Sequence, residues 1–125
     1  MKPVIYIAGP YRDPRGAHFI KQNIRTAEAC AIRVWQLGAV ALCPHLNVRF
    51  FDGILPDQVW MDGDLELLSR CDASYFYAGF EASEGTRAEY KFCAHRGYPA
   101  FTAEQDVIEF INKYTNMHPA KMETP

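Results

Sequence analysis

"DASYFYAGFEASEGTRAEYKFCAHRG", residues Asp72 to Gly97, holds the two elements from which the fold can be predicted. Its first part, Asp72–Gly79, is a short apolar run that ends in glycine, which predicts a buried strand. Its second part begins near Glu84 and has the composition of a helix, and Gly97 follows where a helix-ending glycine belongs. A strand followed by a helix is the unit from which parallel sheets are built, because parallel strands need crossover connections.

The same alternation continues on both sides of this unit. Further strands are expected at Pro3–Gly9, at Ala39–Pro44 and in "YPAFT" (98–102), and further helices at His18–Leu37, Asp57–Ser69 and Ala103–Tyr114. We therefore expect an α/β fold, a Rossmann- or flavodoxin-like three-layer sandwich with a mainly parallel sheet of four to five strands. Residues 1–114 should form one domain, and residues 115–125 a poorly structured tail.

Composition excludes several classes of protein. About half of the 125 residues are hydrophobic, which is incompatible with a disordered chain. The formal charge of −2 gives no electrostatic basis for binding a nucleic acid polymer or a membrane surface. No apolar run reaches membrane-spanning length, and the first residues are interpreted as a strand rather than a signal peptide.

Cysteines and histidines indicate neither disulfides nor a metal site. The four cysteines are far apart and form no C-x-x-C pair, so we interpret them as small buried residues of a cytoplasmic protein in a reducing compartment. The four histidines lie in separate expected elements without metal-ligand spacing. These residues are Cys30, Cys43, Cys71, Cys93, His18, His45, His95 and His118.

The start of the helix after Asp72–Gly79 is the first candidate site. Gly85 is unfavourable within a helix by about 1 kcal/mol relative to alanine, which suggests that something approaches the backbone closely there. Ser83 and Thr86 can cap the first turn, where free N–H groups form an anion site. Glu89 follows one turn later. An ordinary N-cap at Ser83 and a solvated Glu89 remain open as alternatives.

The other candidates lie at neighbouring strand and helix ends. Arg12 follows Gly9 in the loop after the first strand and can bind a phosphate or carboxylate, although a solvated arginine is an equal alternative. Tyr6 fits either the core or the site, Tyr11 can line a pocket, and Gly9 is expected among the substrate contacts. Asp64 lies on the partly apolar face of the helix Asp57–Ser69, where burial would raise its pKa.

Aromatic residues near the second loop leave two interpretations open. Trp60 is expected to pack but lies close enough to contact a base. Phe50 and Phe51 either stack on a base or fold back onto the core. The loop from Asn47 to Phe51 should therefore influence which base fits.

Three stretches together resemble the nucleoside 2-deoxyribosyltransferase superfamily, including its deoxynucleoside-monophosphate N-glycosidase branch and uncharacterised phage-type relatives. They are "YIAGPYR" (Tyr6–Arg12), "DLELLSRCDA" (Asp64–Ala73) and "SEGTRAE" (Ser83–Glu89), which matches the pattern S-x-G-x-x-x-E. With "HRGYPA" the resemblance extends to about Ala100. It depends on the order and spacing of the motifs, because each one alone is weak.

The resemblance implies a role for each matching residue. Glu89 would be the nucleophile that attacks the anomeric carbon, and Asp64 would contact the substrate and assist departure of the base. Arg12 and Ser83 would hold a 5′-phosphate, whereas the transferase branch usually has an aspartate at the position of Ser83. Pro10 departs from the monophosphate branch, which has a serine there.

The resemblance also implies a homodimer that acts on a small nucleoside or nucleotide without metal or organic cofactor. No residue from a partner subunit can be carried over, because the chain enters its last helix almost directly after "YPAFT". Three alternatives stay open: a phosphoribohydrolase-like enzyme, suggested by "GTRAE"; a nucleotide-sensing module without turnover; and a structural interaction domain.

Overall fold

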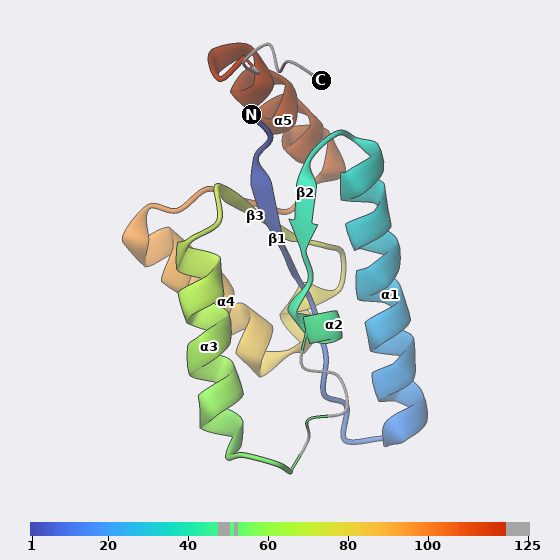
Figure 1. The fold of residues 1–125 in the computed structure, drawn as a ribbon. Helices are drawn as coiled ribbons and strands as arrows, with labels where there is room; N and C mark the ends of the chain where they lie inside the picture. Colours follow the sequence, from blue (N-terminus) through green and yellow to red (C-terminus); the bar gives the residue numbers. More distant parts are fainter. Residues whose placement is uncertain (48–50, 52, 120–125) are drawn as a thin grey trace.

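The computed structural model describes residues 1–47, 51 and 53–119 and has an α/β fold (Figure 1). Four parallel strands form one sheet in the order β2-β1-β3-β4. The strands are β1 (Val4–Ala8), β2 (Val40–Leu42), β3 (Ala73–Phe76) and β4 (Ala100–Phe101). The helices are α1 (Ala17–Gln36), α2 (Pro44–Asn47), α3 (Asp57–Ser69), α4 (Glu84–Arg96) and α5 (Glu104–Met117), with a 3₁₀ helix η1 (Phe80–Ala82) before α4.

The strand order places a switch point between β1 and β3. From β1 the chain runs through α1 to β2 on one side, and it then returns to β3 on the other side of β1. The loops that leave the carboxyl ends of β1 and β3 therefore diverge, and ligands of open α/β sheets bind in the crevice between such loops. Both loops carry residues that the sequence singles out, among them Arg12 and Ser83.

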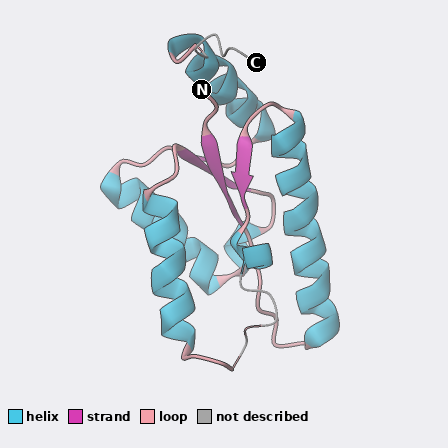
Figure 2. Cartoon of the chain, viewed as in Figure 1, coloured by secondary structure: helices cyan, strands magenta, loops and turns pink. Residues whose placement is uncertain are grey.

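Helices cover both faces of the sheet, which gives the three layers expected from the sequence (Figure 2). Neighbouring residues of β1 point to opposite faces, as in any strand. Ile5 and Ile7 pack with α1 and α5, whereas Tyr6 and Ala8 pack with α3 and α4. The first core contains Ala27, Ala31, Val34, Val107 and Ile111; the second contains Leu68, Phe76, Phe80 and Cys93.

Helix ends follow the expected chemistry where the sequence provides it. Ser83 caps α4, because its Oγ accepts a hydrogen bond from the N–H of Thr86 at 3.3 Å. Gly97 ends the same helix with φ 71°, a left-handed conformation that glycine adopts without strain. The boundaries of α3 agree with those expected from the sequence.

Two short helices and one helix end differ from the expectation. The loop expected after β2 begins with α2, and η1 lies between β3 and α4. The helix α5 continues past Tyr114 to Met117, because Ile111 is buried and Thr115 Oγ1 donates to its carbonyl, so the last turn is still held. Residues 120–125 of the expected tail, like Phe50, lie outside the described residues.

Two further findings concern the chemistry of the whole chain. All four cysteines are described, and each has a free thiol; Cys93 is buried and the other three are partly buried. Of the helices in the described ranges, none combines the length and the apolar character needed to cross a membrane.

Candidate functional site

A hydrogen bond between β1 and α4 forms the centre of the candidate site. The hydroxyl of Tyr6 donates to Oε2 of Glu89 at 2.5 Å. Tyr6 is 1% exposed and belongs to the core under α3 and α4. Glu89 lies in the second turn of α4, is partly buried and is bonded to a core residue of β1, which argues against the alternative of a freely solvated Glu89.

Burial changes the acidity of both groups in this pair. The pKa of Glu89 is raised to about 7, mainly by burial; the hydrogen bond from Tyr6 opposes this rise, and the nearby charge of Asp64 contributes to it. Burial and the charge of Glu89 keep the pKa of Tyr6 well above 10. The tyrosine therefore stays a donor throughout the range in which Glu89 ionises.

Asp64 joins this pair from α3. Burial raises the pKa of its carboxyl to about 6, as expected for an acid on a partly apolar helix face. Its charge also raises the pKa values of Glu89 and Tyr6, so the three groups are electrostatically coupled. The structure thus brings together two carboxyl groups that the sequence separates by a whole βα unit. Perturbed acids of this kind are typical of catalytic sites.

The first turn of α4 directly precedes Glu89 in the chain. Thr86 is 2% exposed, so its side chain belongs to the interior and its substrate contact stays a prediction. Ser83 is occupied as a cap acceptor, yet its hydroxyl proton can still be donated. A Cβ added at Gly85 would meet nothing nearer than Ser83 Oγ at 3.9 Å. Packing within the chain therefore does not explain Gly85, and approach by a ligand stays a prediction.

Gly9 has a different explanation, which the sequence does not reveal. A Cβ at this position would lie 1.9 Å from Cζ of Tyr77, so the aromatic ring requires a glycine there. Tyr77 follows β3 and packs with α1 and α5. The close approach at Gly9 is thus made by the chain itself, and contact between Gly9 and a substrate stays a prediction.

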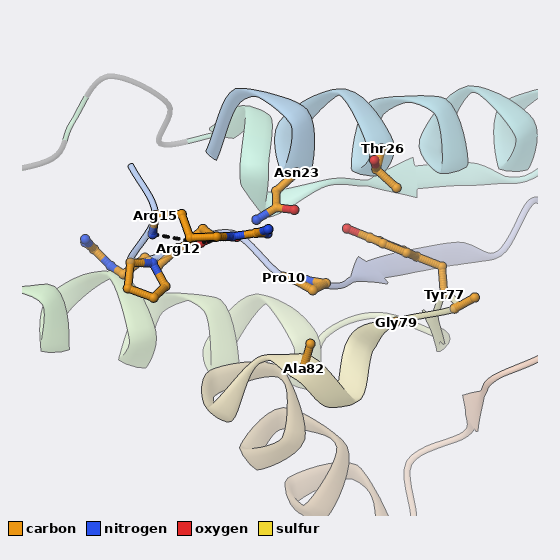
Figure 3. A pocket seen from close by; sticks show the side chains of 11 residues that line it. Pro10, Arg12, Arg15, Asn23, Thr26, Tyr77, Gly79 and Ala82 are labelled. Atoms are coloured by element: carbon orange, nitrogen blue, oxygen red, sulfur yellow. Dashed lines mark hydrogen bonds and ion pairs between the residues drawn. The ribbon is translucent and has the colours of Figure 1, made fainter. Parts of the chain in front are cut away.

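Arg12 is tied to the beginning of α3. Its guanidinium donates to Oδ1 of Asp57 at 2.7 Å, and both side chains are more than half exposed, at 56% and 59%. Exposed ion pairs contribute about 0–1 kcal/mol, so a bound anion can share or replace Asp57 at little cost. Arg12 also lines a cleft of about 320 Å³ whose wall contains none of Glu89, Asp64 and Tyr6 (Figure 3).

Two polar residues, the buried His45 and the partly buried Asn23, support the loop after β1. A ring nitrogen of His45 lies 2.8 Å from the carbonyl oxygen of Pro10, and burial lowers the pKa of His45. The His45 ring also packs edge-on against Tyr11, with centroids 5.4 Å apart. Asn23 donates to the carbonyl of Tyr11 at 3.1 Å. These contacts fix the direction in which the loop, and hence Arg12, leaves the sheet.

For the aromatic residues in and after the loop that follows β2, the structure favours packing over contact with a base where the residues are described. Phe51 and Trp60 lie with ring centroids 5.8 Å apart, which favours packing of the loop onto α3. The indole N–H of Trp60 is buried and has no hydrogen-bond partner among the described residues. Within the same described ranges, no three His, Cys, Asp or Glu side chains gather as they would to hold a metal ion.

Sequence reasoning missed three contributions to the site. It assigned Tyr6 to substrate binding or to the core and did not predict its hydrogen bond to Glu89. The available signal was the alternation of side chains along β1, which places Tyr6 and Ala8 on the face that α4 covers. It did not select Tyr77, whose importance appears only through Gly9. It treated His45 as ordinary, and no local signal points to Pro10.

Comparison with known proteins identifies a family but no activity. Residues 3–103 match the model of a family described as a domain of unknown function (DUF7768), and the chain belongs to that family. No curated protein matches the chain.

Proposed function

We propose that this member of the DUF7768 family cleaves or transfers the N-glycosidic bond of a (deoxy)nucleoside or its 5′-monophosphate, with Glu89 as the nucleophile. One observation carries the proposal: two partly buried, coupled carboxyl groups, one of them held by Tyr6, lie where β1, α3 and α4 meet. Paired acids with raised pKa values are what glycosidic bond cleavage needs. The resemblance to nucleoside 2-deoxyribosyltransferases supplies the substrate class.

The chemistry follows from the two acids. An ionised Glu89 oxygen bonds to C1′ of the sugar, while the C1′–N bond breaks and its electron pair leaves with the base. Tyr6 already binds Oε2, so Oε1 is the oxygen that attacks. Protonated Asp64 gives its proton to the departing base. Water then attacks C1′, the bond between C1′ and Glu89 breaks with its electron pair returning to the carboxylate, and ionised Asp64 takes the proton of the water, which completes hydrolysis. A second base in place of water gives transfer with net retention, and the proposed steps need no metal or organic cofactor.

Recognition of the substrate involves the ends of β1 and β3. Arg12 and the hydroxyl of Ser83 are the proposed contacts for a 5′-phosphate, together with the N–H groups at the start of α4. Tyr11 would line the sugar side of this site. Anchoring a remote phosphate positions the anomeric carbon against Glu89, which contributes to the rate through orientation.

A screen for release of free base tests the proposal. Purified protein is incubated with deoxynucleosides, ribonucleosides and their 5′-monophosphates, with and without an acceptor base, beside Glu89→Ala, and products are separated by chromatography. Base released by the parent protein alone establishes an N-glycosidase, and a new nucleoside that forms only with acceptor establishes a transferase. If nothing turns over but nucleotides raise the melting temperature, the protein is a binding module.

The pH dependence of kcat/KM should be bell-shaped with a narrow optimum. The reactive form has Glu89 ionised and Asp64 protonated, so it exists only while the coupled pair holds a single proton. With pKa values of about 6 and 7 for Asp64 and Glu89, the single proton lies mainly on Glu89, and the reactive arrangement is a minority form that is most populated near pH 6.5. Initial rates measured from acidic to alkaline pH check this. A rate that stays constant well above pH 7 would show that no protonated acid is needed.

Replacing Gly85 by alanine should stabilise the protein and impair substrate binding. An alanine fits the open space at this position, so helix propensity should add about 0.5–1 kcal/mol to the free energy of unfolding. The new methyl group would occupy space that the ligand needs, and KM should rise about tenfold or more. Denaturant unfolding and initial-rate kinetics measure the two effects.

Gly63 provides the matched control for this substitution. It is the other glycine inside a described helix, and a Cβ there also meets no atom within 4 Å. Gly63→Ala should increase stability by a similar amount and leave KM unchanged. If Gly85→Ala also leaves KM unchanged, the ligand does not approach this helix end.

The proposal includes a homodimer, as the resemblance implies, and a cytoplasmic location, which rests on the interpretation of the cysteines. Exposed large apolar side chains concentrated in the stretch of chain from α2 to the first half of α3 support an interface, because exposed apolar surface of this kind is a common feature of interaction sites. They are Leu46, Phe51, Ile54, Leu55, Val59 and Met61. Sedimentation equilibrium of the purified protein measures the oligomeric state.

A further inference from the structure

A cleft lies beside the candidate active site, where Tyr77 packs on the opposite face of the sheet from Tyr6. The cleft of about 320 Å³ runs between α1, the loop after β1 and the loop after β3 (Figure 3). Tyr77, which lines it, packs with α1 and α5, whereas Tyr6 and its bonded Glu89 lie under α3 and α4. The cleft therefore lies apart from the pair formed by Tyr6 and Glu89. It shares Arg12 with the contacts proposed above for a 5′-phosphate, whereas the proposed reaction assigns no role to Tyr77 or Arg15.

The hydroxyl of Tyr77 is the feature that points to a ligand. Tyr77 is only 4% exposed, and its buried hydroxyl has no hydrogen-bond partner among the described residues. Figure 3 shows the hydroxyl end directed into the cleft, on the side where Asn23 and Thr26 project from α1. The ring cannot turn away easily, because it packs against the bare backbone of Gly9. A buried hydroxyl without a partner destabilises a protein, so an acceptor from outside would relieve a real deficit.

The neighbouring side chains already use their own hydrogen-bonding groups. Asn23 Nδ2 donates to the carbonyl of Tyr11, and Thr26 Oγ1 donates to the carbonyl of Gln22. Burial raises the pKa of Tyr77 above its usual value, so the phenol stays protonated and able to donate. The cleft thus presents a fixed O–H donor that its polar neighbours on α1 do not satisfy.

The guanidiniums at the cleft can bind an anion through donors that their ion pairs leave over. Arg12 and Arg15 both line the cleft, and each is paired with one exposed or partly exposed carboxylate, Asp57 and Asp13 respectively. Arg15 donates to Asp13 through Nε and one terminal nitrogen, at 3.0 and 2.7 Å, and lies over the ring of Phe19. A guanidinium has five N–H donors, so donors remain on each arginine after these bonds.

We propose that this cleft binds a small oxyanion, a phosphate or carboxylate group, with the Tyr77 hydroxyl and the Arg15 guanidinium as its donors. Its volume is at the lower end of the range for ligand sites, which fits a small group rather than a whole cofactor. The anion can be the acidic end of a molecule bound over Glu89 or a separate small ion. Both sources use the same donors, and the experiment below separates them.

Calorimetric titration with inorganic phosphate tests the proposal without any turnover. Tyr77→Phe should lower the affinity about tenfold or more, because it removes a donor to a charged group. The same variant should melt a few degrees higher without ligand, since its ring no longer buries an unpaired hydroxyl. Arg15→Gln should also weaken binding. Tyr75→Phe removes a hydroxyl two residues earlier in the chain, from a ring at the same core but outside the cleft, and should bind phosphate like the parent.

A second titration, with a nucleoside 5′-monophosphate, identifies the source of the anion. Competition with phosphate, lost in Tyr77→Phe, assigns the site to the acidic end of the nucleotide; simultaneous binding assigns it to a separate ion. If the parent does not bind phosphate at tens of millimolar, or if Tyr77→Phe binds it equally well, the proposal is overturned. Neither result depends on base release, so this proposal and the proposed activity can fail independently.

Discussion

Replacing Glu89 by glutamine is expected to reduce base release by about 10³-fold or more, because the amide cannot form the bond to C1′. Glutamine keeps the size of the side chain and can still accept the hydrogen bond from Tyr6. The loss should therefore appear in kcat with little change in substrate affinity. Glu109→Gln, the same change at an exposed position of α5, should leave the rate unchanged.

The same variant should be more stable than the parent at neutral pH. The folded protein raises the pKa of Glu89 from 4.5 to about 7, so it binds the proton more tightly than the unfolded chain does. The stability from the protonated form is fully present below pH 4.5 and is lost as the pH rises through about 7. By pH 8 the parent should have lost on the order of 3 kcal/mol from this group, whereas glutamine does not titrate.

Melting temperatures of the two proteins, measured across this pH range, give the comparison. Asp64 contributes a loss in the same direction in both proteins, so only their difference reports on Glu89. The difference should grow between pH 4.5 and 8. A parallel pair of curves would show that Glu89 has an ordinary pKa and that the carboxyl is not held as the structure has it. A more stable but inactive variant is the mark of a residue kept for function.

The layers of the fold were predictable from local patterns. Runs such as Pro3–Gly9 are too short and too apolar for a surface helix. The end of α4 was predictable because Gly97 adopts the left-handed conformation that glycine allows at a helix end. The short elements were not predictable, because distant contacts hold them. The α2 turn depends on the bond between His45 and Pro10, and η1 depends on Phe80 packing against Phe76 and Tyr90.

The candidate site shows the same division. Glu89 and Asp64 were identified because their spacing matches a family motif, and the helix boundaries place each on the expected turn. Their environment could not be predicted, since the bond between Tyr6 and Glu89 joins residues 83 positions apart and requires the register of β1 with β3. Gly9 illustrates the opposite error: a glycine that the sequence assigns to a ligand is required by Tyr77.

Replacing Asp64 by asparagine tests the second acid, and the expected loss is about 10²- to 10⁴-fold in base release, the usual contribution of a general acid. The pKa of about 6 leaves a substantial fraction of Asp64 protonated at the proposed optimum. Asparagine can donate a hydrogen bond but cannot transfer a proton. The fall in parent activity above pH 6.5 should therefore be absent from the variant. Asp62→Asn, an exposed neighbour on α3 that accepts from Gln58, is the control.

The choice of substrate separates proton donation from a merely structural role. A nucleoside whose purine is methylated at N7 carries a positive charge on its base, and this base leaves without being protonated. Asp64→Asn should therefore lose far less activity on such a substrate than on the ordinary nucleoside. An equal loss on both would assign Asp64 to positioning the sugar or Glu89. The fixed charge on the base does the work of the proton and restores no contact to the sugar. Activity that returns only with the methylated substrate therefore reports on the step in which the base departs.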